Sequence, residues 1–82
     1  MVTYFYNVLV DKDIIPDDCK NFYCRMSGLT KLPNLPQSLK RLECQCNYLT
    51  ELPQLPNGLK LLYCYSNNLT ELPELPQTLR AL

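Results

Sequence analysis

The amino-acid sequence predicts a repeat solenoid with a parallel β-sheet on its concave face, extended polyproline-like segments on its convex face, and little or no helix. Three observations support this fold class: a 20-residue period, a short apolar alternation in each period, and a doubled Leu-Pro pair later in each period. Self-similarity at a fixed period is the signature of repeat architectures, in which stacked units bury a continuous core.

The period of 20 residues runs through the 82-residue chain. It relates columns of identical residues, for example Leu29, Leu49 and Leu69, or Cys24, Cys44 and Cys64. We therefore expect a single domain over residues 1–82. Its units are residues 2–21, 22–41, 42–61 and 62–81, and Leu82 begins a fifth.

The first unit is the most divergent. In the 20-residue alignment, Val2 and Tyr4 fall on the strand positions of Leu42 and Cys44, and Asn7 falls on the column of Asn47. Cys19 and Phe22 take leucine positions by the same rule. The unit lacks the first Leu-Pro pair and carries Lys12-Asp13 there instead.

Each unit is expected to begin with a short strand. Apolar and polar residues alternate in Leu42-Glu43-Cys44, which is typical of a half-buried strand. An Asn column follows at Asn47 and Asn67, with Ser27 in its place in the second unit. These amides should turn inward and pair with backbone groups, because a buried amide is tolerated only when it is hydrogen-bonded.

The second half of each unit is expected to be extended. All seven prolines lie in the two Leu-Pro columns. Proline removes an N–H group and pushes its predecessor towards extended geometry, so this segment cannot be the interior of a helix. Helical spacing also fits Leu39, Leu42, Cys46 and Leu49, but Gly58 and residues 66–68 interrupt the equivalent window in the next unit.

The pattern L-x-x-L-x-C-x-x-N-x-L, seen from Leu39 to Leu49, resembles the signature of the leucine-rich-repeat family. The short unit with its doubled Leu-Pro resembles the repeats of bacterial type III secreted effectors and of large DNA virus repeat proteins. The resemblance implies a protein-binding role, with a host protein as one candidate partner. It does not carry over the ubiquitin-ligase activity of the effectors, because nothing in this chain matches a ligase domain.

Composition excludes several function classes. Eight basic and eight acidic residues give zero net charge, which argues against a nucleic-acid binder, and no segment is suited to a membrane. The absence of His removes the usual general base and the usual zinc sites, so we expect no enzyme, metal or cofactor. Five cysteines, an odd number, favour free thiols in a reducing, cytoplasmic compartment, or host cytoplasm for an effector or viral protein. Cys46 is the one thiol expected near the surface.

The outward positions of the strands form the candidate binding surface. Tyr and Arg are enriched there, and these residue types dominate interface hot spots. The predicted partner-binding residues are Phe5, Tyr23, Arg25, Arg41, Glu43, Gln45, Tyr63 and Tyr65. A second column of cations precedes the strands and consists of Lys20, Lys40, Lys60 and Arg80.

The sequence thus predicts a non-enzymatic module that binds a protein or peptide through its concave sheet. The alternative is a structural spacer, or a fragment of a longer leucine-rich-repeat protein such as the substrate-recognition segment of an effector. Self-association is a further expectation, because solenoids need polar terminal caps and Leu82 opens an apolar edge.

Overall fold

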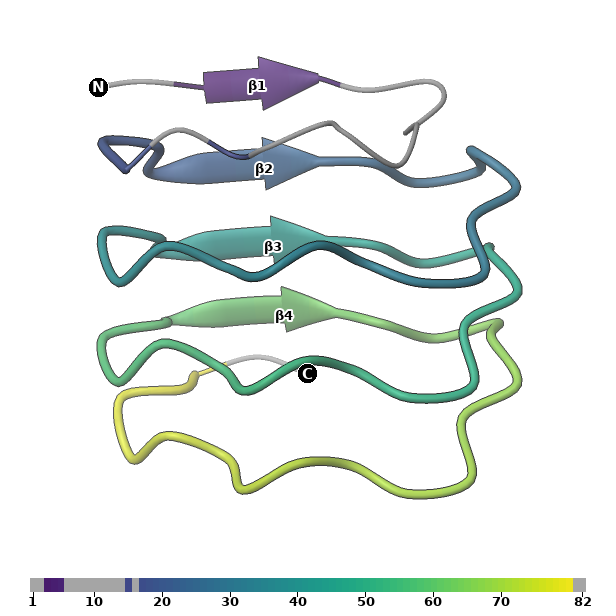
Figure 1. Cartoon of the computed structure of the whole chain (residues 1–82). Helices are drawn as coiled ribbons and strands as arrows, with labels where there is room; N and C mark the ends of the chain where they lie inside the picture. The colour runs from purple at the N-terminus through teal and green to yellow at the C-terminus, as the bar shows by residue number, and fades with distance from the viewer. Residues whose placement is uncertain (1–2, 6–14, 16, 81–82) are drawn as a thin grey trace.

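A computed structural model describes residues 3–5, 15 and 17–80, and for residues 3–5 the backbone alone. Its four parallel strands form one sheet in the order of the sequence (Figure 1). They are β1 (Thr3–Phe5), β2 (Asn21–Tyr23), β3 (Arg41–Glu43) and β4 (Leu61–Tyr63). The described residues contain no helix, and therefore no helix that could cross a membrane. The parallel sheet and the lack of helix were both predicted.

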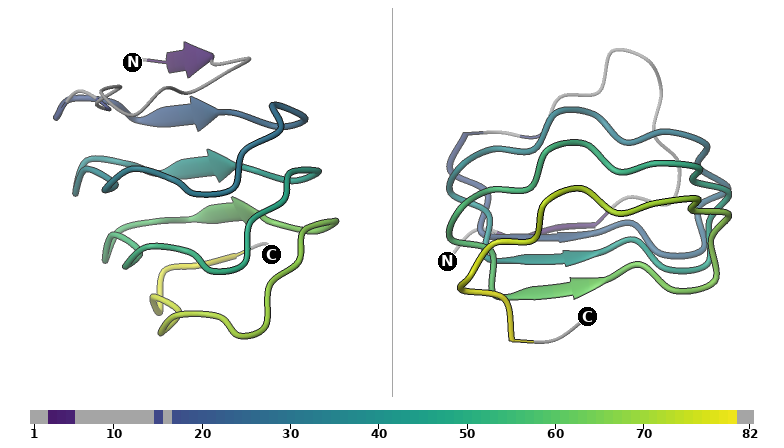
Figure 2. Two further views of the ribbon diagram at one scale, coloured as in Figure 1. Left: turned by 45° about the vertical axis from the view of Figure 1, so that its right-hand side comes forward. Right: turned by 90° about the horizontal axis from the view of Figure 1, so that it is seen from below.

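The described chain has two layers (Figure 2). After each of the strands β2, β3 and β4 the chain turns, runs back as an extended segment on the opposite side, and turns again. These return segments carry the Leu-Pro pairs. The ring of each proline fixes its φ angle, which keeps the backbone extended. Apolar side chains from both layers meet between them.

Strands β2, β3 and β4 pair with an offset of 20 residues. Phe22, Leu42 and Leu62 are direct neighbours across the sheet. The ladder continues beyond the strands, where Cys44 N–H donates to Tyr63 O over 2.8 Å and Cys46 N–H donates to Tyr65 O over 3.0 Å. The 20-residue period of the sequence is therefore the register of this part of the sheet.

The predicted alignment of β1 is wrong by two residues. Tyr4 pairs with Phe22, and Phe5 with Tyr23, so the offset between β1 and β2 is 18 residues. A displacement of two residues keeps the alternation of faces, so the apolar pattern does not select against it. The first unit also carries Lys12-Asp13 in the first Leu-Pro column, and residues 6–14 and 16 of the connection lie outside the described residues. Val2 and Asn7 lie outside the described residues.

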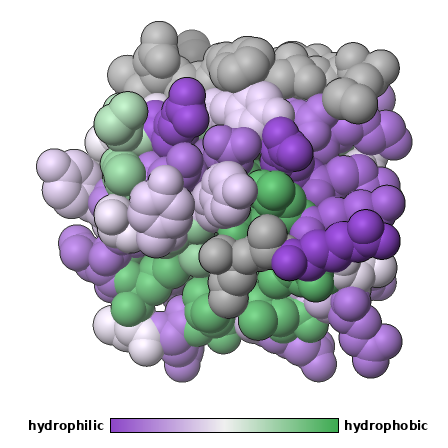
Figure 3. All heavy atoms as spheres, turned by 180° about the vertical axis from the view of Figure 1, so that it is seen from behind, coloured by the Kyte–Doolittle hydropathy of each residue, from purple (hydrophilic) through white to green (hydrophobic). Residues whose placement is uncertain are grey.

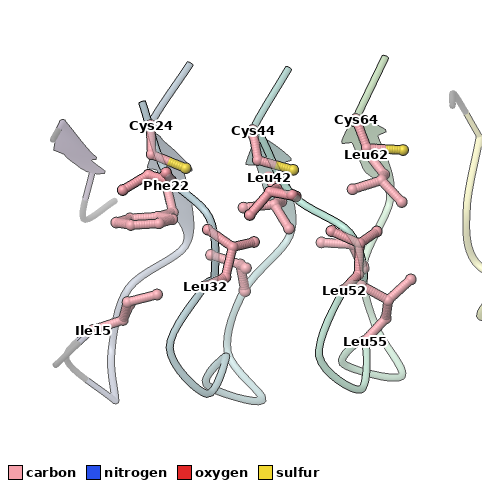
Figure 4. Close-up of a cluster of buried hydrophobic side chains, with 14 of the residues drawn as sticks. Ile15, Phe22, Cys24, Leu32, Leu42, Cys44, Leu52, Leu55, Leu62 and Cys64 are labelled. Carbon is pink, nitrogen blue, oxygen red and sulfur yellow. The ribbon is translucent and has the colours of Figure 1, made fainter. Parts of the chain in front are cut away.

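The core lies between the sheet and the return segments (Figure 4). Strand residues Phe22, Leu42 and Leu62 are fully buried, and Cys24, Cys44 and Cys64 stand beside one another along the stack. The return segments add Leu32, Leu52 and Leu55, and the turns add Cys19, Leu39 and Leu59. The leucine columns thus form buried ridges as predicted, except at Leu35, which is half-buried, and in the last return segment. There Leu72 is 42% exposed and Leu75 is 39% exposed.

Two inward-facing asparagine amides, buried at Asn47 and half-buried at Asn67, connect the units after the strands. Asn47 Oδ1 accepts the N–H groups of Ser27 and Leu29, each over 3.0 Å. Asn47 Nδ2 donates to Cys24 O (3.1 Å) and Cys44 O (2.9 Å). These contacts satisfy backbone groups of two consecutive units at the point where the chain leaves the sheet.

Asn67 repeats the arrangement one unit later. Its Oδ1 accepts Leu49 N–H over 3.0 Å, and its Nδ2 donates to Cys44 O and Cys64 O over 3.1 and 3.0 Å. Ser27, at the same place in the second unit, uses its hydroxyl on Arg25 O within its own turn. The inward-facing asparagines predicted from the sequence are confirmed at positions 47 and 67.

The residue before each of these positions has a left-handed backbone. Met26, Cys46 and Ser66 have φ angles of 51°, 63° and 56°. Few residues other than glycine adopt this region, and here it turns the chain so that the next side chain points inward. The strain recurs with the period, as part of the repeat.

A second set of contacts ties the turns that precede the strands. Ser38 Oγ lies 2.6 Å from both Asp17 O and Cys19 O, and Thr78 Oγ1 lies 2.9 and 2.7 Å from the equivalent carbonyls of Asn57 and Leu59. Gly58 interrupts this hydroxyl column. A Cβ there would lie 2.5 Å from Lys40 Nζ, which is the end of a flexible side chain.

We expect Asn47→Leu to lower the free energy of unfolding by about 2–4 kcal/mol, because each buried backbone group left without a partner costs about 1–3 kcal/mol. Urea denaturation measures the change. Asn68→Leu is the matched control, since Asn68 is exposed, and it should change stability by less than about 0.5 kcal/mol. Equal effects of the two substitutions would contradict the buried amide ladder.

We expect Gly58→Ser to raise the free energy of unfolding by about 1 kcal/mol or more. The serine hydroxyl would reach the carbonyls of Gln37 and Leu39, as its equivalents do, and Lys40 Nζ can move aside. Gly58→Ala should raise the free energy of unfolding by only about 0.4–1 kcal/mol, because it restricts the unfolded chain but adds no hydroxyl group. A serine variant no more stable than the alanine variant in the same denaturation assay would refute the hydroxyl column.

Candidate functional site

The candidate site is the outer face of the sheet, which Figure 3 views from behind Figure 1. The centre of each strand points into the core, so the flanking residues point outward. These outward side chains are half-buried or exposed on β2, β3 and β4. Strongly hydrophilic side chains gather where the strands begin, and side chains of intermediate hydropathy gather where the strands end (Figure 3). Apolar side chains lie along the C-terminal edge.

A charged cluster occupies the middle of this face. The Glu43 carboxylate lies 3.8 Å from Arg25 Nη1 and 3.9 Å from Arg41 Nη1. Arg41 Nη1 also donates a hydrogen bond to Tyr23 Oη over 3.2 Å. This hydrogen bond, followed by the electrostatic interactions of the guanidinium with Tyr23 and with Glu43, raises the pKa of Arg41. Four predicted site residues, Tyr23, Arg25, Arg41 and Glu43, are therefore brought together.

The two arginines keep most of their hydrogen-bonding capacity. The side chains of Arg25 and Arg41 are 61% and 45% exposed, whereas that of Glu43 is only 12% exposed. Both ion-pair distances are longer than a hydrogen bond. The cluster therefore presents two accessible guanidinium groups, each with spare N–H donors, above a covered carboxylate.

Tyr63 and Tyr65 form an aromatic pair beside the charged cluster. Their ring centroids are 6.3 Å apart with a tilt of 57°, within the range of favourable aromatic packing. Tyr65 is 57% exposed, so much of this area is open to a partner. The prediction that both tyrosines lie on the face with the arginines agrees with their outward places in and beyond β4.

Two predicted site residues differ from expectation. Gln45 was expected to be exposed, but the residue is only 5% exposed. It stands between Arg25 and Tyr65, its equivalents in the neighbouring units, and these large side chains flank it. Phe5 was expected in the column of Arg25, but its backbone pairs with Tyr23.

Gln45 is also chemically unusual. Its Oε1 is the one buried side-chain oxygen or nitrogen among the described residues that has no hydrogen-bond partner. A buried acceptor without a donor costs free energy, so such atoms are rare in native structures. The sequence gives no sign of this feature, because the alternation of the strand places Gln45 on the outward face.

Sequence reasoning also missed Tyr48, which is largely exposed just beyond the strand end. The equivalent residues in the neighbouring units are Gly28 and Asn68, which are typical of turns, so this column did not indicate a binding position. On the return side, a shallow groove of about 610 Å³ lies along the last unit. It is lined by Gln54, Leu55, Asn57 and residues 73–78.

The cysteines offer no reactive centre in the core. All five thiols are free, and Cys46 alone among them is not buried, as predicted. Burial raises the pKa of the Cys24 thiol to about 12 and also raises the pKa of Cys44 and Cys64. The thiolate is the nucleophile and the metal ligand, so these groups are poorly suited to either role. Within residues 15 and 17–80, no cluster of three or more His, Cys, Asp or Glu side chains is suited to a metal.

Comparisons with known proteins add no family. No protein-family model matches the chain, and neither a curated protein sequence nor a solved structure matches it.

We expect one thiol to react rapidly with a water-soluble disulfide reagent in the native protein, and this thiol is Cys46. The other four should react only as the protein unfolds, because their thiols are buried and out of reach of the reagent. Absorbance of the released chromophore measures both phases. Cys46→Ser should abolish the rapid phase, and a rapid phase that survives this substitution would contradict the buried placement of the other cysteines.

Proposed function

We propose that the chain is a leucine-rich-repeat solenoid whose concave sheet face binds a protein or peptide without catalysing a reaction. The observation that carries the proposal is the composition of that face. Two accessible guanidinium groups and an aromatic pair, of which Tyr65 is exposed and Tyr63 half-buried, lie together on the sheet. Such residues supply large contact area and polar anchors to interface hot spots.

The repeat geometry supports this function. Parallel strands in register place Arg25, Arg41 and Tyr63, which are far apart in sequence, on one continuous surface. A partner that contacts this surface meets side chains held by buried strands and by the amides of Asn47 and Asn67. A preorganised surface binds with less loss of side-chain and loop freedom.

A structural role is the second candidate, and one observation favours it. The last return segment exposes Leu72 and Leu75, which in the preceding unit correspond to buried Leu52 and Leu55. A further unit or a second copy of the chain would cover them. A spacer of this kind would not depend on the tyrosines of the sheet face. The free thiols suit a reducing, cytoplasmic setting, which we also propose.

We expect peptides selected from a displayed random library to bind the sheet face. Tyr65→Ala and Tyr63→Ala should each weaken the selected peptides at least about tenfold, as hot-spot aromatics do. Isothermal titration calorimetry measures the affinities. Lys31→Ala, at an exposed position of the return side, is the control and should leave them unchanged.

The folded state of each variant is checked by its denaturation midpoint. Selected peptides that bind the two tyrosine variants as tightly as the parent protein would contradict the proposed face. A library that yields no binding peptide would also count against it.

A further inference from the structure

The charges of the chain are distributed unequally between its two sides. The sheet side, including the residues just before each strand, holds six basic side chains and one acidic side chain among the described residues. The basic ones are Lys20, Arg25, Lys40, Arg41, Lys60 and Arg80, and the acidic one is Glu43. The turns and return segments hold Lys31 with Asp17, Asp18, Glu51, Glu71 and Glu74.

This separation gives the sheet side, together with the edge at which the strands begin, an excess of positive charge. Lys40 Nζ lies at that edge, beside Gly58. Asp17 and Asp18 lie in the turn before Lys20, so the excess of positive charge is greatest around β3 and β4. Lys40 and Lys60 are exposed in neighbouring units, and Arg41 begins β3 next to Lys40. Like charges at adjacent positions repel one another, and an acidic partner would relieve that repulsion.

The arginine pair is arranged to receive a carboxylate. Arg25 and Arg41 approach the same Glu43 carboxylate from two sides at 3.8 and 3.9 Å, so the cluster keeps one uncompensated positive charge. Their exposed N–H groups face solvent above Glu43. A guanidinium binds a carboxylate strongly because it can donate two parallel hydrogen bonds.

The arginines need a hydrogen-bond acceptor from the partner, whereas Gln45 needs a donor. Its buried, unpartnered Oε1 needs a hydrogen-bond donor. The two side chains that flank it, Arg25 and Tyr65, are both exposed and can rotate when a ligand arrives. A peptide backbone supplies N–H donors, whereas the phosphodiester backbone of a nucleic acid supplies none.

We infer that the partner of the sheet face is an acidic peptide segment. A carboxylate of the segment binds the guanidinium groups of Arg25 and Arg41, and a backbone N–H donates to Gln45 Oε1. Lys40 and Lys60 attract further acidic residues, and Tyr63 and Tyr65 provide apolar area. This inference rests on the proposed binding function and names the chemistry of its ligand.

The experiment uses peptides selected by the folded protein from a displayed library with equal numbers of acidic and basic positions. We expect the selected peptides to be rich in Asp and Glu. The double variant Arg25→Gln/Arg41→Gln should weaken them about 10-fold or more, because each arginine loses charged hydrogen bonds. Lys31→Gln removes a positive charge from the return side and is the matched control, with a change below about twofold.

Gln45→Met tests the buried acceptor. Methionine fills a similar volume without a polar atom, so we expect a free protein at least as stable as the parent but an affinity for the selected peptides lowered by about fivefold. Unchanged affinity would overturn the role of Gln45. A single-stranded oligonucleotide of the same net charge as the best peptide is the comparator, and it should bind more weakly.

The outcomes separate this inference from the proposed function. Neutral or basic peptides that lose affinity in Tyr65→Ala would retain the binding face but overturn the acidic ligand. An oligonucleotide that binds as tightly as the peptide would assign the face to polyanions in general. Acidic peptides that are insensitive to the sheet-face variants would overturn both.

Discussion

The pairing of backbone groups by the amides of Asn47 and Asn67 is the constraint on which the rest of the structure depends. The chain must leave each strand after a few residues in order to complete one unit in 20, and its backbone groups at that corner are buried. One asparagine amide accepts N–H groups of the preceding unit and donates to carbonyls of both units. Only a side chain with both donors and an acceptor can do this. The left-handed residue before each asparagine supplies the turn that directs it inward.

The proposed binding face follows from the same constraint. Once the corners are fixed, the strands pair in register and each column of side chains stacks at one level. Apolar columns face the return segments and make the core, so the remaining columns must face outward. The outer columns vary from unit to unit, which places arginine, glutamate and tyrosine beside one another on one surface of the paired strands. Repeat proteins acquire distinct surfaces in this way, because their outward side chains vary while the core pattern repeats.

Much of this architecture could be predicted from the sequence, because the period is a direct record of the register. The column of Cys24, Cys44 and Cys64 followed from spacing and alternation, and the inward amides followed from the need of a buried amide for hydrogen-bond partners. Cys46 was placed at the edge of the strands. The offset of β1 did not, since a displacement of two residues preserves the alternation of faces.

The details of the face were also beyond the sequence. The burial of Gln45 and the Arg–Glu–Arg cluster both depend on side-chain conformations, which the repeat pattern does not give. A column identifies which residues are adjacent, but it does not give the distances between their polar atoms. The net charge of the chain is zero, so the excess of positive charge on the sheet side is found only when each charged residue is assigned to one of the two layers.

The most direct test of the account is a nuclear Overhauser measurement on the isotope-labelled protein. Stacked units place equivalent residues of neighbouring strands about 4.8 Å apart, which is within reach of the method. We expect cross-peaks between the protons of Cys24 and Cys44 and between those of Cys44 and Cys64, with matching cross-peaks along Phe22, Leu42 and Leu62. Cross-peaks that link any of these residues to partners at other offsets, in place of the 20-residue series, would contradict the stacked register and every conclusion built on it.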